Sequence, residues 1–235
     1  MAELFSHNRI SEQILEIRYT PNPSFLDYRG TFAQAIAELL NLENWQINEN
    51  RIDIFNNEKI TRAFVSYKNL GLIIHNSPEK GYFSDQATKF VKYVFSQKPF
   101  EVPIHILRIG VRSRFAEEVD MEFSELVELF SKKYCGPTEE VKGIFSGNLV
   151  DVGAPLNFEL ENGAINSHTG PMGQSQVKGF FPLLKVIPEI AIYTELDYWK
   201  IFDKPLKVEE VTRALKYYSV ESWDIQEKIF RLIAD

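Results

Sequence analysis

The sequence predicts an α+β protein with two similar strand-helix-strands halves, an antiparallel-rich sheet and a helical C-terminus. The element order is strand, helix, several strands, helix, and then strand, helix, several strands, helix, which is typical of α+β proteins and not of doubly wound sheets. A weak repeat accompanies it. "ILEIRYTPN" from Ile14 is similar to "ILRIGVRSR" from Ile106, and "TFAQAIAELL" from Thr31 to "EFSELVELFS" from Glu122.

The first half opens with a strand at 13–20, "QILEIRYT", which Pro21 and Pro23 end. A helix then begins near Ser24, because the apolar residues that follow recur at helical spacing. Asn-rich turns separate the next segments. We expect strands at 45–55, 61–68 and 70–76, and then a helix with Ser84 as its N-cap.

The second half opens with a long strand at 102–115, followed by a helix that Asp120 caps and Gly136 and Pro137 end. Glycine and proline in 166–176, "NSHTGPMGQSQ", favour a turn. The tail from Pro205 is helical, with a break near Ser219. We expect further strands at 144–152, 155–160, 164–168 and 188–199.

No Gly/Ser-rich linker divides the chain, so residues 1–235 are expected to fold as one compact unit. The repeat suggests that this unit contains an internal duplication of residues 1–100 and 101–235. Two strand-helix units can also look alike through composition alone, so both origins stay open.

Composition limits the function classes. With 26 basic and 33 acidic residues the net charge is −7, which opposes bulk attraction to nucleic acid and to anionic lipid. The apolar runs are far shorter than a membrane-spanning helix, and Cys135 is the only cysteine. We therefore expect a cytoplasmic protein without membrane contact. The four histidines have no metal-ligand spacing, so neither a metal site nor a cofactor is predicted.

A row of arginines is the strongest candidate site. Arg108, Arg112 and Arg114 share one face of the strand at 102–115, with Gly110 as an opening between them, and the apolar residues, including Leu107, share the other. Arg18 joins the row if the first strand lies alongside. Converging guanidinium groups can bind phosphate or carboxylate, whereas a solvated face with acidic partners needs no ligand.

The glycine-rich turn is a second candidate. His168, Gly170 and Gly173 are predicted to form a mobile contact surface. A catalytic interpretation is weaker, because Ser167 and His168 would point to opposite faces of an extended segment and no G-x-S-x-G elbow is present.

The two strand motifs carry a family resemblance. "EIR" at 16–18 precedes "RIGVR" at 108–112, and the chain ends in a helical segment. This pattern resembles a sporadically distributed family of uncharacterised prokaryotic proteins, in which an early Glu-Ile-Arg strand precedes a middle Arg-Ile-Gly-Leu-Arg strand. Tyr-Ile-Asn usually follows the second motif, whereas this chain continues with Ser113-Arg114-Phe115. The resemblance implies no biochemical activity.

The sequence therefore predicts a binding or regulatory protein that carries out no catalysis and acts on a protein partner or a small anion. The first alternative is a hydrolase of a phosphorylated or nucleotide-like small molecule, with His168 or His75 as base and the arginines stabilising charge. The second is nucleic-acid binding through the arginine face, which the net charge disfavours. A homodimer is expected from base rates alone.

Overall fold

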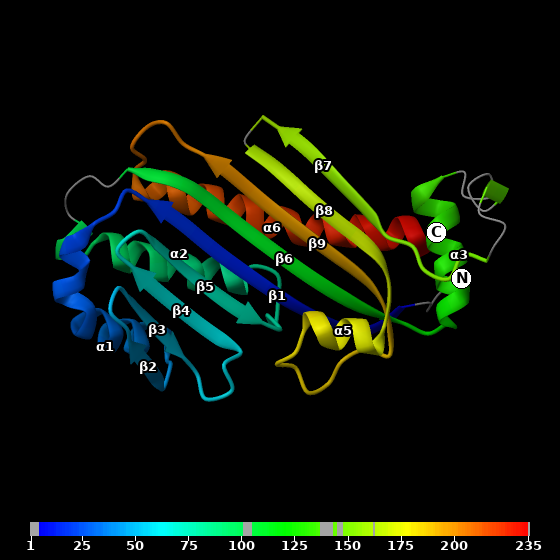
Figure 1. The fold of residues 1–235 in the computed structure, drawn as a ribbon, viewed down its shortest axis with the longest axis horizontal. Coiled ribbons are helices and arrows are strands. Elements are labelled where there is room, and N and C mark those ends of the chain that lie inside the picture. The colour runs from blue at the N-terminus through cyan, green and yellow to red at the C-terminus, as the bar shows by residue number, and fades with distance from the viewer. Residues whose placement is uncertain (1–4, 101–104, 137–142, 145–147, 162, 235) are drawn as a thin grey trace.

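The computed structural model describes residues 5–100, 105–136, 143–144, 148–161 and 163–234. It confirms an α+β fold with one nine-stranded antiparallel sheet, in the order β2-β3-β4-β5-β1-β6-β9-β8-β7 (Figure 1). The strands are β1 Phe5–Tyr19, β2 Asn44–Ile47, β3 Arg51–Phe55, β4 Thr61–Ser66, β5 Asn69–His75, β6 Ile106–Val119, β7 Ala154–Leu160, β8 Gly163–Gly173 and β9 Ile190–Ile201. The α-helices are α1 Arg29–Leu40, α2 Tyr82–Phe95, α3 Phe123–Phe130, α5 Gln174–Phe180 and α6 Val208–Ala234, and 3-10 turns occupy Pro23–Tyr28 and Lys98–Phe100.

The two halves meet at the centre of the sheet. β1 and β6, the first strand of each half, pair with one another, and the last strand of each half, β5 or β9, pairs with its own first strand. The remaining strands of each half continue outward to the edge. The predicted strand-helix-strands halves are therefore present, while their origin by duplication stays a prediction.

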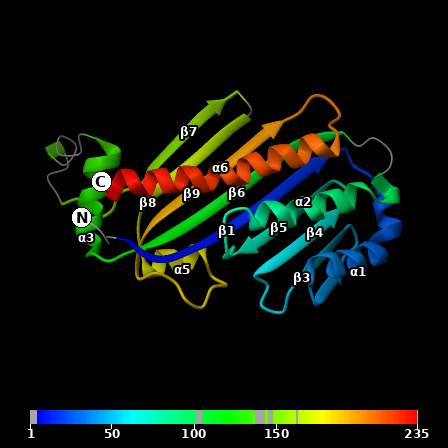
Figure 2. The ribbon, with the colours of Figure 1, turned by 180° about the vertical axis from the view of Figure 1, so that it is seen from behind.

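The helices cover the two faces of the sheet unequally. α1, α2 and α6 lie on one face, which we call the covered face, and α3 lies at one end of the sheet (Figure 2). On the opposite face, which we call the open face, α5 is the one helix of the described residues that overlies the sheet, and it does so near one end (Figure 1). The main apolar core fills the space between the covered face and these helices, with Leu15 and Val111 from the sheet, Phe90 from α2 and Leu215 from α6. A smaller cluster lies under α5.

α6 is one continuous helix of 27 residues, so the predicted break near Ser219 is wrong. Serine is a weak helix former, but Ser219 is fully buried, and its hydroxyl accepts a hydrogen bond from the Gln13 amide at 3.1 Å. Tertiary contact with β1 thus compensates for the low helix propensity.

Within the described residues, no helix is both long and apolar enough to cross a membrane.

The predicted turn at 166–176 is also wrong, because β8 continues to Gly173 and α5 begins at Gln174. Neither Gly170 nor Gly173 has a positive φ angle. Gly170 is needed for close packing instead, since a Cβ atom there would lie 2.7 Å from the Val152 carbonyl oxygen. The glycine therefore marks a close backbone contact and not a reversal of the chain.

Candidate functional site

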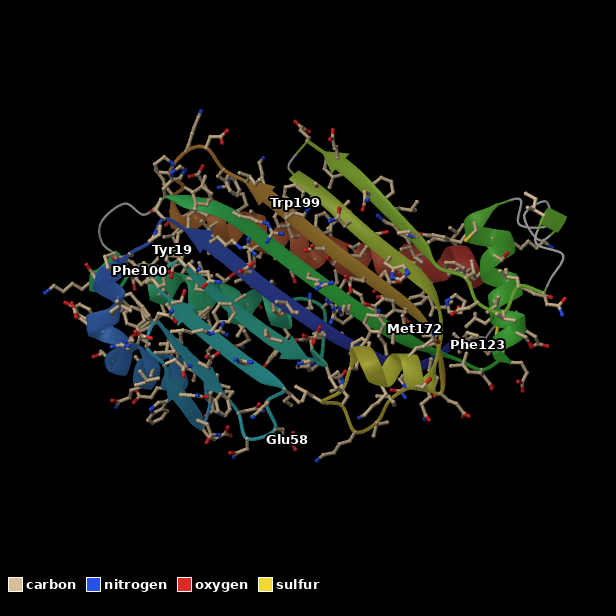
Figure 3. The ribbon with its side chains drawn as sticks, viewed as in Figure 1. Tyr19, Glu58, Phe100, Phe123, Met172 and Trp199 are labelled. Carbon is tan, nitrogen blue, oxygen red and sulfur yellow. The ribbon has the colours of Figure 1, made fainter. Side chains whose placement is uncertain are left out.

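The four predicted arginines lie on the open face of the sheet. In the β1–β6 ladder Arg18 is opposite Arg108, and Arg112 and Arg114 follow on alternate residues of β6. Figure 3 shows the side chains of this face, with Trp199 on β9 and Met172 beside α5. Residues opposite one another in an antiparallel pair share a face, so the predicted period-two arrangement is present.

The same ladder brings the two sequence motifs together. Glu16, Ile17 and Arg18 of the first motif pair with Gly110, Ile109 and Arg108 of the second. The prediction that Leu107 enters the core is wrong, because its side chain is 39% exposed. A register shift between Arg18 and Tyr19 interrupts the ladder next to Leu107 and changes the alternation there.

Arg112 and Arg114 are held by carboxylates. The Arg112 Nε donates to Glu195 Oε1 at 2.9 Å, and the Arg114 Nε donates to Glu195 Oε2 at 2.8 Å. A further bond of 2.8 Å joins Arg114 Nη1 to Glu12 Oε1, and Tyr193 donates its hydroxyl to Glu195 at 2.7 Å. Burial by itself raises the pKa of Glu195, but the hydrogen bonds from Tyr193 and the two arginines lower it below its ordinary value. These two arginines are therefore compensated within the protein.

Arg18 and Arg108 are compensated less completely, because both reach the same carboxylate oxygen. Glu16 Oε2 lies 2.8 Å from Arg18 Nη2 and 3.5 Å from Arg108 Nη1, while Asn69 donates to the other oxygen at 3.0 Å. Burial raises the pKa of Glu16, and the hydrogen bonds from Arg18 and Asn69 lower it by more. Lys68 is exposed nearby and has no carboxylate partner among the residues that the structure describes.

A cavity of about 370 Å³ opens at this end of the sheet. We call it the Arg18 pocket, and its walls include Glu16, Arg18, Lys68, Asn69 and Leu107. The Arg18 side chain is 55% exposed and therefore accessible to a ligand. Two guanidinium groups sharing one carboxylate, with a lysine beside them, leave a local excess of positive charge.

Asp197 is a charged residue of this face that sequence reasoning missed. It lies opposite Arg112 in the β6–β9 ladder, and its carboxylate accepts no hydrogen bond from any described side chain or loop backbone group. Burial raises its pKa, and the positive charges of Arg108 and Arg112 oppose that increase. The alternation in "TELDYW" could have placed Glu195 and Asp197 on one face, but only the strand pairing shows that this face is the one that carries the arginines.

Gly110 does not leave the predicted opening for a ligand. The Arg108 guanidinium lies across it, so that a Cβ atom at Gly110 would be 3.1 Å from Arg108 Nη1. The absence of a side chain at Gly110 is what lets Arg108 extend over its own strand towards Glu16. Arg108 also lies over the Trp199 ring, with its Cζ 5.8 Å from the ring centroid.

His168 lies on the open face of β8 and is exposed, whereas Ser167 points to the other face and is buried. The His168 and Tyr193 rings meet edge to face at 6.2 Å, and a cavity of about 320 Å³ beside His168 includes Gly170 and Asp151 in its walls. Gly173 lies at the N-terminus of α5, where its N–H donates to Gln176 Oε1 at 2.9 Å. His168 and Gly170 thus share a cavity that Gly173 does not line.

His75, the other histidine considered as a base, lies on β5 and is buried. Its Nδ1 atom is 3.4 Å from Glu12 Oε2, without the geometry of a hydrogen bond. Strands β1, β6 and β9 separate β5 from the strand that carries His168. Neither histidine is hydrogen-bonded to a serine, threonine or cysteine within the described part of the chain. The described residues also contain no cluster of three metal-ligating side chains.

Comparisons with known proteins add little. No protein-family model matches the chain, and no curated protein does. Among solved structures, "Methanococcus jannaschii TBP" matches over 96% of this chain and 97% of that chain, with 10% sequence identity and a TM-score of 0.31. A likeness at this TM-score assigns neither a fold nor a function to this chain.

Proposed function

We propose that this protein binds a small anion at the Arg18 pocket and performs no chemistry on it. The observation that carries the proposal is the sharing of Glu16 Oε2 by Arg18 and Arg108 while Lys68 has no acidic partner among the described residues. Guanidinium groups that keep unused N–H donors can bind a phosphate or carboxylate group directly. The protein's overall charge of −7 makes such a local excess of positive charge notable.

The alternatives find less support in the geometry. A hydrolase needs a base next to a nucleophile or an activated water, and the described contacts of His75 and His168 provide neither. Nucleic-acid binding needs a surplus of cations across the face. The four predicted arginines of the open face instead lie among four acids of the same face, namely Glu12, Glu16, Glu195 and Asp197, so any surplus of cations is confined to the Arg18 pocket.

The proposal is tested by titrating the protein with inorganic phosphate and with citrate in a calorimeter at low ionic strength. We expect at least one of them to bind. Arg18→Gln should weaken that binding about tenfold or more, because a hydrogen bond to a charged group is worth about 1.5–3 kcal/mol. Lys89→Gln, at an exposed position on α2, is the matched control and should bind as the wild type does.

Arg112→Gln separates the Arg18 pocket from the arginine row as a whole. Because Glu195 already engages Arg112, the substitution should change anion affinity much less than Arg18→Gln does. The proposal is wrong if neither anion binds, or if Arg18→Gln binds as tightly as the wild type.

A further inference from the structure

A third cavity lies on the covered side of the sheet, where the end of β9 meets the first turns of α6. Its volume is about 320 Å³, and its walls include Lys200, Phe202, Arg213 and Tyr217. We call it the Tyr217 pocket. Figure 2 shows α6 lying across β9 and β6 on this face, whereas the Arg18 pocket opens on the opposite face.

The two cations of the Tyr217 pocket have no acidic partner in the described part of the chain. Among the described residues, neither Lys200 nor Arg213 has a carboxylate oxygen within 4.0 Å, in contrast to the arginines on the open face. Lys200 Nζ lies 5.8 Å from the Phe202 ring centroid, and Arg213 is exposed. Glu210 also lines the cavity, and its carboxylate accepts a hydrogen bond from the Lys207 N–H at 2.8 Å.

The Tyr217 side of the pocket is supported by two further tyrosines that lie beneath it. Tyr217 is 47% exposed, and its ring meets Tyr218 edge to face at 5.8 Å. Tyr218 is stacked on Tyr198 of β9 at 5.3 Å, with the two rings 13° apart. Burial raises the pKa of Tyr218 to about 12, so this support stays neutral near pH 7. Arg213 and Tyr217 are four residues apart and thus neighbours on one helix surface.

We propose that the Tyr217 pocket binds a small planar aromatic compound that carries one anionic group. The ring of the ligand stacks on Tyr217, and its phosphate or carboxylate lies between Lys200 and Arg213. An aromatic platform and a pair of cations each recognise one part of such a ligand. The cavity is at the lower end of the roughly 300–1,000 Å³ range of ligand pockets, which favours a compact ligand. Glu210 disfavours a second anionic group.

Adenosine monophosphate and salicylate are the probes, because they carry the two anionic groups that fit. Each is titrated into the full-length protein and followed by calorimetry, with adenosine and inorganic phosphate as partial ligands. We expect one of the complete ligands to bind at least about tenfold more tightly than adenosine, since contact with a charged partner contributes about 1.5–3 kcal/mol. Binding of adenosine monophosphate alone identifies a phosphate ligand, and binding of salicylate alone identifies a carboxylate ligand.

Variants test separately the stacking of the ligand ring on Tyr217 and the binding of its anionic group by Arg213. Tyr217→Leu and Arg213→Gln should each weaken binding severalfold, and both side chains are exposed, so folding should persist and can be checked by circular dichroism. Arg231→Gln, an exposed arginine near the other end of α6, and Arg18→Gln should bind as the wild type does. The proposal is overturned if neither complete ligand binds, or if binding is lost in Arg18→Gln and retained in Arg213→Gln.

Discussion

Gln13 joins the central strand to the C-terminal helix through a side chain that is fully buried. Its amide nitrogen donates to the hydroxyls of Ser113 and Ser219 at 3.3 and 3.1 Å. Its carbonyl oxygen accepts from the Ser77 hydroxyl and the Trp223 indole, each at 3.3 Å. All the hydrogen-bonding capacity of the amide group is used, so this residue helps to fix the register of α6 against β1.

We predict that Gln13→Leu destabilises the protein by about 2 kcal/mol or more. The substitution leaves the Trp223 N–H and the serine hydroxyls buried without partners, and each unsatisfied buried group costs about 1–3 kcal/mol. Urea unfolding followed by tryptophan fluorescence measures the loss. Gln174→Ala, at an exposed position, should change the unfolding midpoint only slightly. An unchanged midpoint in Gln13→Leu would show that the network does not stabilise the fold.

At the residue scale, period-two alternation placed the arginines of β6 on one face, but it could not identify their partners. Glu195 lies 83 residues beyond Arg112 in the sequence, and only strand pairing brings the two side chains together. Whether an arginine is compensated thus depends on long-range pairing that alternation along one strand does not contain.

At the scale of elements, β4 and β5 pack through a glycine that sequence reasoning passed over. The Phe64 ring lies directly over Gly71, where a Cβ atom would be 2.4 Å from the ring and 2.5 Å from the Leu15 carbonyl oxygen. Arg51 also lies over the ring, with its Cζ 4.0 Å from the ring centroid. The aromatic ring thus replaces the missing side chain on the open face of β5.

Gly71→Ala should therefore destabilise the protein by about 2 kcal/mol or more, since an overpacked site of this kind forces the ring or the backbone to move. Gly30→Ala is a control of the opposite sign. Gly30 lies within α1, and a Cβ atom added there would meet open space, so alanine should stabilise by roughly 0.5–1 kcal/mol through helix propensity. Thermal unfolding of both variants provides the comparison, and a stable Gly71→Ala variant would contradict this account.

The turn expected at 166–176 and the helix break expected near Ser219 were wrong for a shared physical cause, which is compensation by neighbouring strands and helices. Pro171 suggested a turn, yet it continues β8 because β7 pairs with β8 only as far as Thr169. Beyond that point β8 is not paired with β7, and such an edge position tolerates a residue that lacks an N–H. By contrast, β1 and β6 follow period-two patterns that their own residues determine, and both were predicted as strands.

At the scale of the whole molecule, the strand-helix-strands order was predictable because each half carries its own periodicity. Where the two similar segments lie in the sheet was less predictable. The matched segments that begin at Ile14 and Ile106 lie at the end of β1 and at the start of β6, and Ile17 and Ile109 face one another across the ladder. The similar segments of β1 and β6 thus pair with one another at the centre of the sheet. An origin by duplication remains a prediction.

The stability of the whole fold should also depend on pH, through a buried histidine in the open-face network. His75 is 6% exposed, and burial lowers its pKa below the ordinary value near 6.5. Glu12 on β1 opposes this effect, and Arg114 on β6 adds to it. The carboxylates of Glu12 and Glu195 are already balanced by Arg112 and Arg114, so a charged imidazole would be uncompensated.

Because the folded protein binds this proton less readily than the unfolded chain, the stabilisation is complete above about pH 6.5 and is lost as the pH falls through the lowered pKa of His75. We expect the urea midpoint to decrease between about pH 7.5 and about pH 5. This range lies above the ordinary pKa of the carboxylates. His75→Gln should decrease less over the same range, since glutamine does not titrate. His168→Gln, at an exposed histidine, should keep the wild-type dependence. Equal slopes for His75→Gln and the wild type would assign the pH dependence to other groups and leave His75 without a part in it.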